Sequence, residues 1–72
     1  MQGYTAVVQQ RGRWWIGWVE EMPGVDSQGE SREELLSNLQ SALEEALEMN
    51  RADAIAAAEG EPYEEVKVSA AA

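Results

Sequence analysis

The sequence predicts an α+β fold in which a three-stranded antiparallel sheet, one long helix and a returning strand follow in the order β-β-β-α-β. Two runs rich in aromatic and β-branched residues flank a glycine in the first third of the chain. Apolar residues then recur every three or four positions, and an alternating segment follows a Gly-Glu-Pro turn. With 72 residues, we expect a single domain over residues 1–72 with a small core.

The first two predicted strands form a hairpin. They span residues 4–10 and 13–20 and are separated by Arg11-Gly12, and a glycine turn between two such runs is typical of a hairpin. Met22-Pro23-Gly24 then ends the second strand, because proline lacks a backbone donor and glycine adopts turn conformations readily. A short third strand is expected over Val25–Gly29.

The second predicted strand has two apolar faces. Alternation places Trp14, Ile16 and Trp18 on one face, and Trp15 and Val19 on the other. If the first face packs against the helix, Trp15 points outward. The first strand leaves the assignment open, since it offers apolar residues on both of its faces. One helix covers only one face, so the other needs a second subunit or a partner.

The predicted helix begins with a capping box. The hydroxyl of Ser31 can accept from the amide of Glu34, whose carboxylate reaches back. The apolar stripe that follows is expected to face the sheet and consists of Leu35, Leu36, Leu39, Ala42, Leu43, Ala46 and Leu47. We expect a break or bend near Asn50 and further helix up to Gly60.

The last predicted strand spans Tyr63–Val68. Its residues alternate between apolar and charged, and three charged residues fit an exposed sheet edge, where they discourage unwanted pairing: Glu64, Glu65 and Lys67.

Composition excludes several classes of function. Neither histidine nor cysteine is present, which removes disulfides, thiolate metal sites and the commonest general base. Five basic residues against 14 acidic ones give a net charge of -9, which disfavours direct contact with nucleic acid or an anionic membrane and favours a basic protein partner. The chain has no apolar run of membrane-spanning length and no targeting signal, so a cytoplasmic location is expected.

No catalytic, cofactor-binding or metal site is assigned. Three carboxylates near the Pro-Gly turn could hold a hard cation, namely Glu20, Glu21 and Asp26, but a metal-dependent nuclease would need them to converge. In so acidic a chain such residues usually only solvate the surface. The glycine spacing matches no phosphate-binding loop, and Arg11 and Arg13 are weak support for nucleic-acid binding.

Residues 4–48 resemble the amino-terminal domain of HicB-like antitoxins. The resemblance rests on a hairpin that leads into Glu20–Val25, on the run Gly29–Leu35, and on Asn38-Leu39 and Ala42 in the helix that follows. It implies a partial ribonuclease H-like fold without the catalytic set of the nuclease. It also implies a small basic messenger-RNA-cleaving partner, a HicA-type toxin, whose active site the antitoxin covers.

Departures from the family pattern limit what the resemblance implies. Many members carry a DNA-binding domain after this one, and the present chain has no such domain, so operator binding is not expected. Val25 stands where cysteine or leucine is frequent in the family, a change that affects core filling more than function. The chain therefore resembles the short, stand-alone type.

Three functional hypotheses follow. The first is a non-catalytic antitoxin-like module that neutralises a HicA-type toxin, with Trp15, Glu20 and Glu21 as its expected partner contacts. The second is a stand-alone homo-oligomer, a dimer or tetramer, in which two apolar sheet faces meet and no toxin takes part. The third is a metal-dependent nuclease or small-molecule enzyme, which has only fold analogy in its favour.

Overall fold

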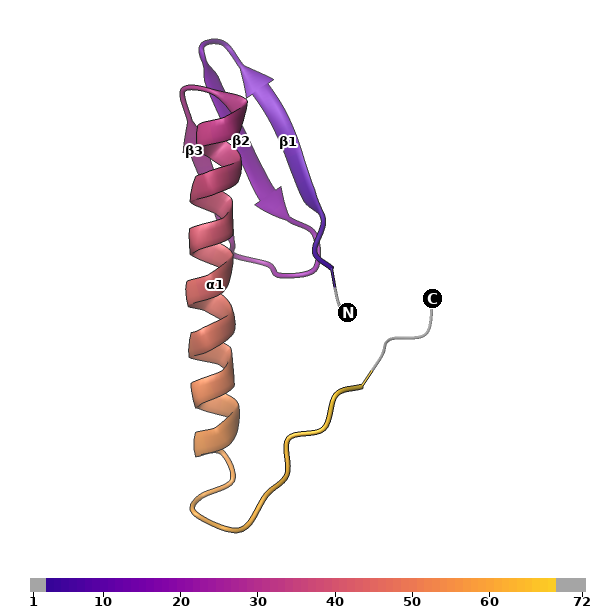
Figure 1. The fold of residues 1–72 in the computed structure, drawn as a ribbon. Coiled ribbons are helices and arrows are strands. Elements are labelled where there is room, and N and C mark those ends of the chain that lie inside the picture. Colours follow the sequence, from indigo (N-terminus) through magenta and orange to yellow (C-terminus); the bar gives the residue numbers. More distant parts are fainter. Residues whose placement is uncertain (1–2, 69–72) are drawn as a thin grey trace.

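Three strands precede one helix in the computed structural model, which describes residues 3–68 (Figure 1). β1 spans Ala6–Arg11, β2 spans Trp14–Val19, β3 spans Asp26–Gly29 and α1 spans Arg32–Ala56. The strands form one antiparallel sheet in the order β1-β2-β3, and α1 packs against it. The α+β class, with a three-stranded antiparallel sheet and a long helix, is confirmed.

A two-residue turn closes the hairpin between β1 and β2. Arg11 pairs with Trp14, and Gly12 has a φ of 62°. A glycine with positive φ at the first of the two turn residues is typical of tight hairpins, because this backbone twist matches that of the strands. The turn fixes the register of the whole hairpin, which extends to the pair Ala6 and Val19.

The predicted capping box starts the helix. The Ser31 hydroxyl accepts from the Glu34 amide at 3.1 Å, and the Glu34 carboxylate accepts from the amide of Glu30 at 3.3 Å. One amide that the first helical turn would leave unpaired, that of Glu34, is thereby satisfied, and so is the amide of Glu30 just before the helix. The negative charges of Glu33 and Glu34 also lie at the positive end of the helix dipole.

The buried core of the described chain consists of only four side chains: Val19, Val25, Leu35 and Leu39. Six partly buried residues pack around it, namely Val8, Trp15, Met22, Ala42, Leu43 and Ala46. A core of this size is small for a domain of 72 residues. Additional burial between chains would therefore add substantially to stability.

Two glycines allow α1 to approach the sheet closely. A Cβ atom at Gly29 would lie 2.7 Å from the Leu35 amide nitrogen, and one at Gly17 would lie 2.9 Å from the Val7 carbonyl oxygen. The Gly17 position is also within 3.1 Å of a Leu39 methyl carbon. Any larger residue at either position would therefore push the helix away from β2 and β3.

The sequence leaves open which face of β2 is the outer one, and in the structure Trp15 is not on the outer face. Trp15 lies on the helix-facing side and packs against the core, together with Gly17 and Val19. Trp14 and Trp18 lie on the opposite side and are 38% and 39% exposed. The reason is steric, because the helix needs a residue without a side chain beneath Leu35 and Leu39, and Gly17 has the same parity as Trp15.

The helix continues through Asn50 without the expected break. Asn50 keeps helical geometry, and its side-chain amide donates to the sulfur of Met22 at 3.4 Å. The helix ends at Ala56, and the chain turns through Glu59 and Gly60, which both have positive φ. The alanine-rich run therefore extends one helix rather than starting a second.

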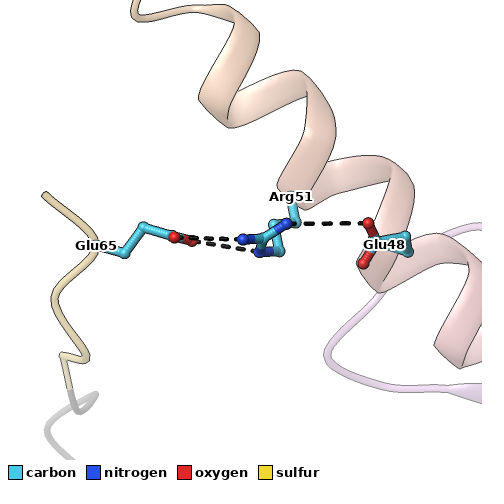
Figure 2. A network of polar contacts seen from close by, with 3 residues as sticks. All are labelled: Glu48, Arg51 and Glu65. Carbon is cyan, nitrogen blue, oxygen red and sulfur yellow. Dashed lines mark hydrogen bonds and ion pairs between the residues drawn. The ribbon is translucent and has the colours of Figure 1, made fainter. Parts of the chain in front are cut away.

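The predicted last strand is not formed. Residues 63–68 have no strand partner in the described chain, and the segment runs back from the helix end without approaching the sheet (Figure 1). It is held by Arg51, whose guanidinium contacts Glu65 and Glu48 (Figure 2). Because α1 is 25 residues long, the segment begins well beyond the core and runs beside the helix end instead of the sheet.

Replacement of Gly29 by alanine should lower the free energy of unfolding by about 2 kcal/mol or more, since the added methyl group meets helix backbone that cannot rotate away. Urea denaturation followed by circular dichroism measures the change. Gly3→Ala is the matched control, because its Cβ meets nothing within 4 Å and it should leave stability nearly unchanged. Equal midpoints for the two variants would contradict the close approach.

Candidate functional site

The candidate site is the face of the sheet that points away from α1. Register and alternation place eight residues on this outer sheet face: Val7, Gln9 and Arg11 of β1, Trp14, Ile16 and Trp18 of β2, and Asp26 and Gln28 of β3. They form two complete cross-strand rows, in which Val7, Trp18 and Asp26 make one and Gln9, Ile16 and Gln28 make the other. The outer sheet face is thus apolar in its middle strand and at Val7, and its other side positions are polar.

A charged rim surrounds the aromatic residues of this face at the hairpin end. The guanidinium of Arg13 lies 5.7 Å from the centre of the Trp14 ring and 3.7 Å from a Glu30 carboxylate oxygen. The ion pair is exposed and contributes little energy, and the same guanidinium lies over the indole face of Trp14. An aromatic centre with a polar rim is the usual composition of a protein-binding surface.

The surface between β2 and β3 is hollowed on this side. Its walls come from Ile16, Trp18, Asp26 and Gln28, together with the backbone of Gly17 and Ser27. Trp18 offers a large and rigid aromatic surface beside the Asp26 carboxylate. Such a combination of indole and carboxylate can bind an apolar side chain and a neighbouring cation of a partner protein.

The structure separates the three predicted partner contacts. Trp15 lies on the helix side of the sheet, opposite Gln10 and Gly29, whereas Glu20 and Glu21 follow the other end of β2. Five residues of extended chain between Trp15 and Glu20 correspond to about 17 Å. The three residues therefore do not form one surface.

Glu21 has a structural contact of its own. Its carboxylate accepts a hydrogen bond from the backbone amide of Thr5 at 2.7 Å, and the Glu20 amide donates to the Thr5 carbonyl at 2.9 Å. The Thr5 hydrogen bond stabilises the charged form and lowers the pKa of Glu21 below its ordinary value. Glu20 remains exposed, and its side chain is available at this end of the sheet.

The outer sheet face offers no arrangement for metal chemistry. Within residues 3–68, no three acidic side chains converge to hold a metal ion, and Glu20, Glu21 and Asp26 do not form such a group. In the same part of the chain, no helix combines the length and the apolarity needed to cross a membrane.

Sequence reasoning missed Trp14 and Trp18 as exposed residues. The signal that could have found them is Gly17, which lies on the same side of β2 as Trp15 and Val19. A glycine beneath a helix with several leucines permits close packing, while a tryptophan in its place does not.

Comparison of the chain with protein-family models, curated proteins and solved structures gave no match.

The Thr5 amide should report the titration of Glu21. Because the hydrogen bond lowers the pKa of Glu21, the bond stabilises the fold above the ordinary glutamate pKa of about 4.3 and is lost as pH falls through the lower folded value. The Thr5 amide chemical shift, followed by NMR from neutral to acid pH, is expected to change with a midpoint below that ordinary value.

Glu21→Gln is the control for this titration. The variant keeps an acceptor oxygen but has no charge to titrate, so the shift of the Thr5 amide in this acid range should disappear. A Thr5 amide that titrates identically in both proteins would contradict the assigned hydrogen bond.

Proposed function

We propose that this chain is a non-catalytic, cytoplasmic binding module that neutralises a small basic messenger-RNA-cleaving toxin of the HicA type by covering its active site. The outer sheet face is the proposed contact surface. The observation that carries the proposal is the exposure of Trp14 and Trp18 on a sheet face that α1 leaves uncovered.

The composition of the outer sheet face supports docking of a protein. Tryptophan supplies much of the binding energy at protein interfaces when a partner excludes water from it. Here the indoles of Trp14 and Trp18 flank Ile16, and Arg11, Arg13 and Asp26 lie around them. A partner that covers the indoles would bury apolar area at the centre and form polar contacts at the rim.

The net charge of -9 supports a basic partner. Carboxylates line the solvent side of α1, including Glu33, Glu44 and Glu48, and all three are exposed. A ribonuclease that binds RNA needs a cationic surface, and a strongly acidic protein attracts such a surface over a distance. Charge thus speeds the encounter, and the aromatic residues hold the complex.

The resemblance to HicB-like antitoxins supports this class of partner. Asn38, which belongs to the resembling motif, donates from α1 to the Gln28 carbonyl oxygen at 2.9 Å and joins the helix to β3. The proposal includes a partial ribonuclease H-like fold that lacks nuclease activity. In this view the module acts by occlusion, so it needs no catalytic group of its own.

Inhibition of RNA cleavage tests the proposal. The HicA-type ribonuclease of the host, identified by low-salt affinity capture with the full chain and intact-mass analysis, is assayed on a defined RNA with increasing amounts of the chain. We expect complete inhibition at equimolar protein. Trp18→Glu should weaken inhibition by about 30-fold or more, because it places a charge at the centre of the interface.

Met49→Glu is the matched control for this variant. Met49 is a large apolar residue of α1 that is 67% exposed and lies off the sheet, so its replacement should leave inhibition unchanged. Undiminished RNA cleavage in an excess of the wild-type chain would overturn the proposed function. If Trp18→Glu and Met49→Glu lose inhibition equally, the assignment of the outer sheet face as the contact surface would be wrong.

Electrostatic steering makes a second prediction. The association rate constant for the cationic toxin, measured by stopped-flow fluorescence of the tryptophans, should fall about tenfold between about 0.01 M and 0.5 M salt, while dissociation changes less. An association rate that is independent of salt would contradict steering by the acidic surface.

A further inference from the structure

β1 has a free edge and lies outside the cover of the helix. No Cα atom of α1 lies within 8 Å of a β1 Cα atom, and both elements are described in full. The Glu20 amide donates to the Thr5 carbonyl, and pairing in an antiparallel ladder alternates, so the backbone groups of Ala6, Val8 and Gln10 point to the free edge. This edge can accept a further strand.

An unfilled apolar groove adjoins this edge. Its apolar lining side chains are Tyr4, Ala6 and Val19 from the sheet side and Leu36, Leu39 and Leu43 from α1. We call it the β1 groove. A dry cavity of about 150 Å³ can hold a benzene molecule. With a volume of about 160 Å³, the β1 groove therefore has room for one or two valine side chains.

The C-terminal segment has the matching features. Val66 and Val68 share one face of the extended chain, and they are 70% and 82% exposed. β-branched residues favour strands, and these two are without cover in the described chain. The chain thus presents both an open strand edge with an apolar groove and an extended apolar segment that has not been paired.

In the structure the C-terminal segment lies away from the groove of its own chain. The guanidinium nitrogens of Arg51 lie 3.3 Å from both carboxylate oxygens of Glu65, so Glu65 lies beside the helix at Arg51 (Figure 2). The groove begins at Leu43, and the eight helical residues from there to Arg51 correspond to about 12 Å. Val66, which follows Glu65 directly, therefore lies outside the β1 groove of its own chain in this arrangement.

We propose that residues 66–68 of one copy pair with the free edge of β1 in a second copy and place Val66 and Val68 in its β1 groove. A two-fold axis makes the exchange reciprocal, so each copy gives one segment and receives another. The exchange enlarges a core that contains only four buried side chains among the described residues of one chain. The outer sheet face takes no part in it and stays open to a partner.

Sedimentation equilibrium of the full chain and of substituted chains tests this dimer. The wild-type protein should have twice the 7.9 kDa mass of one chain. The double variant Val66→Ser/Val68→Ser should raise the dimer dissociation constant by more than about 100-fold, because each dimer loses four buried valines. Lys67→Ser, on the opposite face of the same segment, should change it little.

A second variant tests the strand edge without touching the segment. Ala6→Pro removes a backbone donor that points to the free edge, and proline is tolerated on an edge strand when its missing donor would face solvent. The chain should therefore stay folded, as judged by circular dichroism, and become monomeric. A folded Ala6→Pro protein that still dimerises like the wild type would overturn the proposed pairing.

Isotope-filtered NMR identifies which chain supplies the segment. In an equal mixture of ¹³C-labelled and unlabelled chains, Overhauser effects between chains are expected from the valine methyls to Leu39 and Leu43. The same effects within one 7.9 kDa chain would overturn the proposal in favour of intramolecular closure. If Trp18→Glu is monomeric and the double valine variant still dimerises, the proposed strand exchange is wrong and the outer sheet face forms the dimer interface. None of these outcomes depends on toxin binding.

Discussion

Leu35 is completely excluded from solvent because Gly17 and Gly29 let the first turns of α1 lie directly on β2 and β3. This contact organises the molecule. It aligns Leu39 with the same strands, and the Ser31 cap and the Asn38 hydrogen bond to β3 hold the start of the helix in place. Because close packing depends on steric fit, the two glycines determine the position of the helix more than the number of leucines does.

The position of the helix decides which surfaces remain open. α1 covers the inner face of the sheet over β2 and β3 and leaves the edge of β1 uncovered. The outer sheet face keeps two half-exposed tryptophans. The single chain therefore has two separate apolar surfaces that point in different directions. One can serve a copy of the chain and the other a different protein, so self-association and partner binding need not compete.

The local elements were predictable, and their mutual arrangement was less so. The hairpin, the short third strand and the capped helix follow from turn residues, alternation and the Ser31–Glu34 spacing, which act within a few residues. The orientation of β2 could not be assigned from the sequence because both of its faces are apolar, so only contact with the helix distinguishes them. The segment 63–68 alternates like a strand, but the length of the uninterrupted helix determines where it begins. Of the predicted contacts, Glu20 alone remains a free side chain at the sheet end, since Trp15 packs inward and Glu21 binds Thr5.

Gly17 also acts on the fidelity of folding. A strand with two apolar faces can shift by one residue along its neighbours at little hydrophobic cost, and such a shift exchanges its faces. In this chain the shift would bring Ile16 or Trp18 to the place where even one methyl group meets the Val7 carbonyl and the Leu35 and Leu39 methyls. Misregistered hairpins are therefore unable to dock the helix. Gly17 thus prevents, by a steric clash, a one-residue register shift that hydrophobic burial alone would permit.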